Sequence, residues 1–183
     1  MASDAERIKV WDLFVRVFHW SFAVAIIFAW LSHEWRGGGR FLHVWFGYGA
    51  LGLVGLRIVW GVIGTRHARF TDFVQTPVND VRYLASLATG REKRYLGHNP
   101  LGGLMVIALM LATLGLGLTG YYMTQRGAAL LGLGRRDLQH LHGLIGDLFV
   151  VLVPLHILGV VWESVRHREN LLTAMFTGWK RPD

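Results

Sequence analysis

Four histidines lie inside long apolar stretches of the chain, where an imidazole is costly unless it binds something. They are His19, His43, His142 and His156. His142 and His156 are 14 residues apart, and at about 100° per residue this separation is only about 40° short of four full helical turns. Both side chains therefore face one side of a helix, about 21 Å apart along its axis. Because imidazole is the commonest metal ligand, the pattern predicts two metal-binding levels.

The apolar stretches that carry these histidines are long enough to cross a membrane. The chain is 52% apolar and 13% aromatic. About 20 apolar residues, rising about 1.5 Å each, span a hydrocarbon core about 30 Å thick. The sequence predicts an all-α membrane protein, a four-transmembrane-helix bundle formed by a single domain over residues 1–183. We expect the spans at about residues 13–32, 41–63, 101–123 and 141–163, with one long loop at 65–100.

The distribution of basic residues predicts how the chain crosses the membrane. The formal net charge is +7, and thirteen Lys and Arg lie in the N-terminal arm, the 65–100 loop and the tail after Trp162, against five in the other two loops, with Arg57 uncounted. By the positive-inside rule, both termini and the 65–100 loop are expected in the cytoplasm. The charge then indicates membrane lipid, and not nucleic acid, as the partner. The first span is not expected to be a cleaved signal peptide, because Arg16 and His19 interrupt its start.

This topology pairs the histidines by depth. Since the first and fourth helices run in opposite directions, His19 and His156 are both expected near the cytoplasmic boundary. The second and fourth helices run the same way, which places His43 and His142 near the outer boundary. Each level offers two imidazoles and no convincing third protein ligand, which favours a metal whose other donors come from its cofactor. Haem fits that description, so we predict two haems between the helices.

Two alternatives stand beside haem. A closed zinc site needs four protein ligands, and Asp147 lies about 140° around the helix from His142, so zinc is disfavoured. A buried histidine can also be a hydrogen-bonded packing residue. His140 competes with His142 as a ligand, but it is rotated by about 160° from His156 and faces away from it. The chain has no cysteine, which excludes iron–sulfur clusters and covalently attached haem.

Several other residues are candidates for supporting such a site. Gly47, Gly146 and Gly159 follow candidate ligands by three or four residues, and could leave bare backbone for a porphyrin or pack helices closely. Asp147 could accept a hydrogen bond from a ligand imidazole, handle protons, or face polar loop residues. The two outer loops carry arginines that could neutralise haem propionates or attract an anion or an acidic partner: Arg36, Arg40, Arg126, Arg135 and Arg136.

Several segments together match one known family. They are Val-Phe-His-Trp-Ser around His19, Leu-His-Val-Trp-Phe-Gly around His43, Arg-Ile-Val-Trp-Gly from Arg57, Gly-His-Asn-Pro-Leu-Gly-Gly from Gly97, the span from Leu141 to His156, and the tail from Glu169 to Thr177. Over nearly its whole length the chain resembles the bacterial cytochrome b561 and nickel–iron hydrogenase cytochrome b-subunit family. The resemblance implies a multi-pass protein of the bacterial inner membrane that exchanges electrons with ubiquinone or another quinone. It also implies two haem b groups, with axial ligands His19, His43, His142 and His156.

The resemblance allows two activities. Some members carry electrons between quinone and a partner, either an oxidoreductase subunit or a periplasmic c-type cytochrome, while small stand-alone members resemble superoxide oxidase, a superoxide:ubiquinone oxidoreductase. The Arg-Phe-Thr-Asp-Phe segment from Arg69 and the Glu-Asn-Leu tail look more like the carrier branch, which we therefore favour. A four-helix transporter that uses the histidines as a proton or metal path is the third interpretation. Two imidazoles per iron leave no open coordination position, so outer-sphere electron transfer is the expected chemistry.

Overall fold

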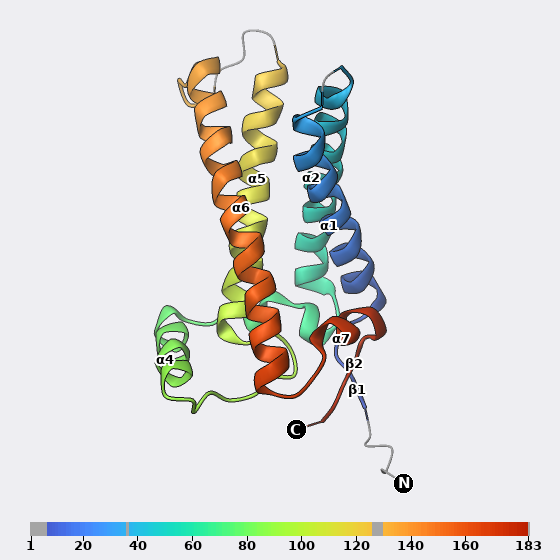
Figure 1. Ribbon diagram of the computed structural model, residues 1–183, viewed down its shortest axis with the longest axis vertical. Coiled ribbons are helices and arrows are strands. Elements are labelled where there is room, and N and C mark those ends of the chain that lie inside the picture. Colours follow the sequence, from blue (N-terminus) through green and yellow to red (C-terminus); the bar gives the residue numbers. More distant parts are fainter. Residues whose placement is uncertain (1–6, 36, 126–129, 183) are drawn as a thin grey trace. The chain divides into compact units, whose positions relative to one another are not determined.

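The structure is a computed structural model that describes residues 7–35, 37–125 and 130–182. Four long helices dominate this part of the chain (Figure 1). Each of the four is long and apolar enough to cross a membrane. This confirms the predicted all-α membrane fold. The helices are α1 (Leu13–His33), α2 (Gly39–Ile63), α5 (Pro100–Thr124) and α6 (Arg135–Arg166).

All four long helices extend beyond the predicted spans, and the starts of α6 and α5 have local causes. α6 begins at Arg135, well before residue 141, because the polar residues ahead of the apolar span are themselves helix-compatible. Asp137 lies in its first turn and accepts a hydrogen bond from the Gly134 backbone N–H at 3.0 Å. α5 begins at Pro100, a residue suited to a first helical turn, and the Asn99 side chain accepts from the Gly102 N–H at 2.7 Å.

The chain divides into two compact units. The bundle unit comprises Phe18–Arg57 and Ala108–Val153, and the loop unit comprises Met1–Val17, Ile58–Ile107 and Pro154–Asp183. Within the bundle unit, glycines allow the helices to approach closely. A Cβ at Gly117 would lie 2.7 Å from a Leu51 methyl carbon, and one at Gly115 would lie 3.0 Å from Ile145. Small residues commonly mediate such packing in membranes, where water does not drive helices together.

The loop unit contains the shorter elements. Its core is a cluster of Val10, Trp11, Val15, Ala68 and Ala174. The strands β1 (Ile8–Lys9) and β2 (Trp179–Lys180) pair antiparallel and so bring the two ends of the described chain together. The remaining elements are η1 (Arg66–Ala68), α3 (Phe70–Phe73), α4 (Pro77–Ala88) and α7 (Leu171–Thr177).

Helix α4 lies within the 65–100 loop. The Asp80–Leu87 pattern predicts this helix, and the structure begins it slightly earlier, at Pro77. One side of α4 carries the buried Tyr83, whereas Val81 and Leu84 are 65% and 51% exposed. A short helix with such exposed apolar residues is typical of a membrane–water interface.

Candidate haem site

His43 and His142 lie next to each other in the bundle unit. His43 comes from α2 and His142 from α6, and their ring centroids are 6.0 Å apart at an interplanar angle of 67°. Metal–imidazole bonds in proteins are about 2 Å long, so two rings bound on opposite sides of one metal ion have centres about 6 Å apart. The separation of the two rings therefore fits one metal ion between them.

Each of these imidazoles is held by a hydrogen bond at its Nδ1 atom. His43 Nδ1 lies 2.8 Å from the Ala29 carbonyl oxygen, which can only accept, so this nitrogen donates. His142 Nδ1 lies 2.9 Å from the Thr119 hydroxyl, which itself donates to the Gly115 carbonyl at 2.7 Å and therefore accepts from the ring. With the proton on Nδ1, both rings present the Nε2 lone pair for coordination.

Small or buried residues make these two anchors possible. Ala29 is 8% exposed, and its methyl group lets the His43 ring approach the α1 backbone. Thr119 is 2% exposed on α5, and its neighbour Gly120 leaves room for the ring, since a Cβ there would lie 3.4 Å from His142 Cε1. Sequence reasoning missed both Ala29 and Thr119. The sequence does mark Thr119, as a hydroxyl inside an apolar span. It cannot mark the Ala29 carbonyl, because every residue has a backbone carbonyl.

His19 and His156 occupy different units. His19 lies on α1 in the bundle unit, half-buried, with its ring edge-on to Trp20 at a centroid distance of 4.9 Å. His156 lies on α6 in the loop unit, also half-buried and two residues after Pro154. The pairing of these two histidines at one cofactor stays a prediction.

The backbone beside the candidate ligands is open. A Cβ added at Gly47, Gly146 or Gly159 would meet no atom within 4 Å, in contrast to the tight glycines of the helix contacts. Within residues 7–35, 37–125 and 130–182, no group of three or more His, Asp or Glu is placed to hold a metal ion. A metal between His43 and His142 would therefore take its other donors from a flat cofactor, and the open backbone fits one.

Comparison with known proteins identifies the family. The family model described as prokaryotic cytochrome b561 matches residues 10–178. The chain belongs to the prokaryotic cytochrome b561 family. It is a multi-pass b-type cytochrome of a bacterial membrane, a protein of electron transfer whose cofactor is haem b.

Curated relatives of the cytochrome match it over nearly their full length. The probable Ni/Fe-hydrogenase B-type cytochrome subunit of Azotobacter vinelandii is 26% identical, covering 96% of this chain and 91% of the relative. The protein of the same name from Cupriavidus necator is 27% identical, with 93% and 86% covered. The one from Rhizobium leguminosarum bv. viciae is 24% identical, with 97% and 90% covered. No solved structure matches the chain.

The other candidate residues of the cytochrome lie away from the anchored imidazoles. His140 and Asp147 are both exposed on α6, and the Nδ1 atoms of His43 and His142 bond to Ala29 and Thr119, not to Asp147. Among the candidate arginines, Arg36 and Arg126 fall outside the described residues. The other three are exposed: Arg40, Arg135 and Arg136.

The four remaining histidines, at the end of α1, in the 65–100 loop and after α6, make local contacts. His67 Nδ1 lies 3.0 Å from an Asp72 carboxylate oxygen, and His167 Nε2 lies 3.2 Å from Glu163. His33 lies 3.3 Å from Glu34. The His98 ring contacts Trp11 and Phe73 at centroid distances of 4.8 and 4.6 Å.

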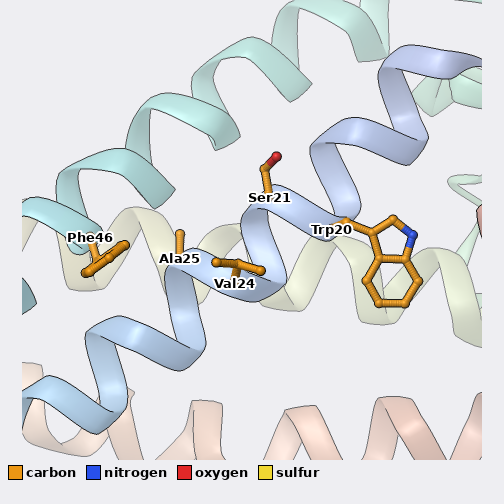
Figure 2. A pocket seen from close by; sticks show the side chains of 5 residues that line it. All are labelled: Trp20, Ser21, Val24, Ala25 and Phe46. Carbon is orange, nitrogen blue, oxygen red and sulfur yellow. The ribbon is translucent and has the colours of Figure 1, made fainter.

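A pocket of about 360 Å³ follows His19 along the first helix of the cytochrome. Figure 2 shows Val24 and Ala25 of α1 between the rings of Trp20 and Phe46, with the hydroxyl-bearing Ser21 beside them. All five residues belong to the bundle unit. A pocket lined mainly by apolar side chains suits a hydrocarbon chain, such as that of a lipid or a quinone.

Proposed function

We propose that the cytochrome, as a single domain over residues 1–183, holds two haem b groups and passes electrons between membrane quinone and a redox partner. His43 and His142 are the axial ligands of one haem, and His19 and His156 are those of the other. Bound haem b supplies one-electron exchange at an iron whose two axial positions are filled by protein. The 6.0 Å separation of the His43 and His142 rings, both anchored through Nδ1, is the observation that supports this most directly.

The chain's own residues hold the imidazoles in one orientation. A hydrogen bond from Nδ1 fixes the tautomer and makes Nε2 a better donor to a metal. Ala29 does this for His43 through its carbonyl, and Thr119 does it for His142 through its hydroxyl. Because the two imidazoles keep one orientation, little structural change needs to accompany the gain or loss of an electron. Small structural change favours rapid electron transfer.

The relatives support an oxidoreductase subunit as the partner. They are named as probable Ni/Fe-hydrogenase cytochrome subunits, and we carry that class of partner over to this chain, with a periplasmic c-type cytochrome as the other candidate. Ubiquinone or another membrane quinone is the small-molecule substrate. We place both termini in the cytoplasm, because most Lys and Arg lie in the terminal segments and the 65–100 loop.

Counting haems in histidine variants tests the ligand assignment. His19→Ala, His43→Ala, His142→Ala and His156→Ala should each leave one haem, as should the double variants within a pair. A double variant across the pairs, such as His43→Ala with His156→Ala, should leave none. His140→Ala is the matched control and should keep two. Retention of two haems in His142→Ala, or loss of one in His140→Ala, would overturn the assignment.

The electron donor distinguishes the carrier from the superoxide enzyme. The purified wild-type protein is mixed with a short-chain ubiquinone and either superoxide or a reduced hydrogenase-type partner, and haem reduction is followed optically. We expect quinone reduction only with the partner. Steady quinone reduction by superoxide alone would identify a superoxide oxidase instead, and a protein without haem absorbance bands would favour the transporter.

A further inference from the structure

The segment that follows α6 contains an arginine in an unusual backbone conformation. Arg168 has a φ of 51°, in the left-handed region. Its N–H donates to the Val165 carbonyl at 3.2 Å, and the next N–H, of Glu169, donates to the Ser164 carbonyl at 3.0 Å. This is the Schellman arrangement of a helix end, and its left-handed position usually holds glycine because a side chain there is strained. An arginine at this strained position indicates that the Arg168 side chain has a function.

Arg168 lines a cavity of about 280 Å³ within the loop unit. Four cationic residues and one acid, Glu169, are among its walls. Hydroxyl and amide groups of Asn170, Thr173 and Thr177 also line it. The composition of these walls is suited to an anion that accepts several hydrogen bonds. The four cationic residues are Arg7, Arg168, Lys180 and Arg181.

The single acid of the cavity is already neutralised by neighbouring groups. Burial opposes ionisation of Glu169, but hydrogen bonds from the Arg181 N–H and the Arg94 guanidinium outweigh it and lower the pKa of its carboxyl. These two bonds are 2.8 and 2.9 Å long. Arg94 is not one of the lining residues, so it offsets the charge of Glu169 from outside the cavity. The charge of Lys180 also lowers the pKa of Glu169. The other three cations leave the walls with an excess of positive charge.

Two of the four cations are held by hydrogen bonds to backbone carbonyls. The Arg181 guanidinium donates to the carbonyls of His167 and Arg168 at the end of α6. The Lys180 ammonium donates to the Tyr95 carbonyl at 3.4 Å. Arg7 and Arg168 are exposed at the cavity. An anion in the cavity would therefore meet the guanidinium groups of these two residues first.

Apolar side chains lie beside this charged cavity. Leu172 and Phe176 are one turn apart on α7, and each is 55% exposed, while Trp179 in β2 is 45% exposed. The opposite side of α7 is secured, because Ala174 and Met175 pack against the core of the loop unit. Exposed Trp and Phe beside Arg are typical of the membrane–water interface, where rings enter the lipid and cations meet phosphates.

We propose that this cavity binds the phosphate group of an anionic phospholipid. Arg7 and Arg168 contact the phosphate, and Leu172, Phe176 and Trp179 enter the adjacent acyl layer. The proposal goes beyond electron transfer and does not depend on the number of haems. The proposal assigns a role to the Glu-Asn-Leu segment, because Glu169 and Asn170 line the cavity and Asn170 also caps α7.

Lipid retention in nanodiscs or detergent tests the site. The full-length protein is reconstituted with phosphatidylcholine alone or with an equal amount of phosphatidylglycerol, and bound lipid is measured by native mass spectrometry. The double variant Arg7→Gln with Arg168→Gly should retain roughly tenfold less phosphatidylglycerol, because each basic residue near an anionic lipid contributes to binding. The control is Arg82→Gln with Arg91→Gln, two exposed cations of the same unit that do not line the cavity. It should retain lipid as the wild type does.

Stability and competition complete the test. Arg168→Gly places glycine at a left-handed position, so it should keep or raise the melting temperature and keep the haem content, which separates lost binding from misfolding. Arg168→Gln is the substitute if the glycine variant does not fold. Equal lipid loss in the control pair, or no loss in the cavity variant, would overturn the proposal. So would displacement of the lipid by millimolar inorganic phosphate, which would identify a soluble phosphate as the ligand.

Discussion

Two polar side chains of helix α6 are held in different ways. They are His142 in the bundle unit and Glu163 in the loop unit. The His142 ring is hydrogen-bonded through Nδ1 to the Thr119 hydroxyl at 2.9 Å. Glu163 accepts from the Tyr83 hydroxyl at 2.8 Å and from the Asn99 amide at 2.6 Å. The comparison teaches that the His142 imidazole is oriented by a polar contact at one ring nitrogen, whereas both donors to Glu163 tie it to the 65–100 loop.

The partners of Glu163 are themselves suited to holding it. Burial and the hydrogen bond to Glu163 raise the pKa of the Tyr83 phenol far above its ordinary value, so Tyr83 remains a donor throughout the physiological range. Asn99 also caps α5 through its carbonyl oxygen, which leaves its amide group to face Glu163. His167, the residue that follows α6, adds a contact to Glu163 at 3.2 Å. Glu163 therefore joins the 65–100 loop to the end of α6.

Removing Glu163 should have the largest effect on stability. Glu163→Leu leaves the Tyr83 hydroxyl and the Asn99 amide without their acceptor, and we expect a loss of roughly 3 kcal/mol in unfolding free energy. The measurement is thermal or denaturant unfolding with limited proteolysis of the 65–100 loop. Glu34→Leu, at a carboxylate 78% exposed, is the control and should change little. Unchanged stability in Glu163→Leu would contradict the structural role of Glu163.

Removing the Thr119 hydroxyl should have a smaller and more local effect. Thr119→Val keeps the shape of the side chain but takes away the acceptor for His142 Nδ1, and loss of such a partner typically weakens metal binding ten- to a hundredfold. We expect faster loss of one haem to apomyoglobin and a shifted midpoint potential for that haem only.

A second buried threonine supplies the control for this experiment. Thr113 on α5 is 3% exposed, and its hydroxyl donates to the Leu109 carbonyl of its own helix. Thr113→Val should leave both haems and their potentials unchanged, and Thr119→Ser should restore the wild-type behaviour. If Thr113→Val and Thr119→Val behave alike, the hydroxyl of Thr119 does not orient a ligand.

The smallest effect is expected at Asp12, which caps α1. Its carboxylate accepts from the Val15 N–H at 2.8 Å, the Trp60 indole at 3.0 Å and the Thr65 hydroxyl at 2.5 Å. Burial opposes its ionisation, but these hydrogen bonds outweigh that effect and lower the pKa of Asp12 below its usual value. Asp12 and Trp60 are only half-buried and Thr65 is exposed, so water can replace the lost acceptor at the side-chain donors. Asp12→Ala should therefore cost about 1 kcal/mol, a typical value for a lost N-cap.

The pH dependence of this effect has a definite sign. Because the pKa of Asp12 is lower in the folded state, its contribution is complete above the ordinary carboxyl pKa, about 4, and is lost as the pH falls through the folded value. The difference in melting temperature between wild type and Asp12→Ala should be constant from pH 7 to about 5 and shrink below about 4. A difference that grows on acidification would contradict this account of Asp12.

The fold could be predicted from the sequence because apolar length and helical spacing are local properties. The four spans and the short helix at Pro77–Ala88 follow from them. The closeness of His43 and His142 also follows, since parallel helices place residues of similar depth together. Ala29 and Thr119 could not be predicted, because they depend on how each helix is rotated about its axis, and apolar composition all round a helix does not specify that rotation.

In the 65–100 loop, too, local features could be predicted from the sequence but long-range contacts could not. In the Gly-His-Asn-Pro segment, Asn99 is recognisable as a helix cap, but its bond to Glu163 joins residues 64 positions apart. His98 lies against Trp11 and Phe73 for equally long-range reasons. The start of α6 at Arg135 was missed because hydropathy marks where the membrane begins and not where the helix does.

The two anchors of the imidazole pair differ in how mutation can reach them. His43 is held by the Ala29 carbonyl, a group that every amino acid possesses, so substitutions at position 29 can disturb this bond only through their size. His142 is held by a side-chain hydroxyl, which a single codon change at Thr119 can remove. Genetic variation therefore has direct access to the bond that orients His142, and much less access to the bond that orients His43.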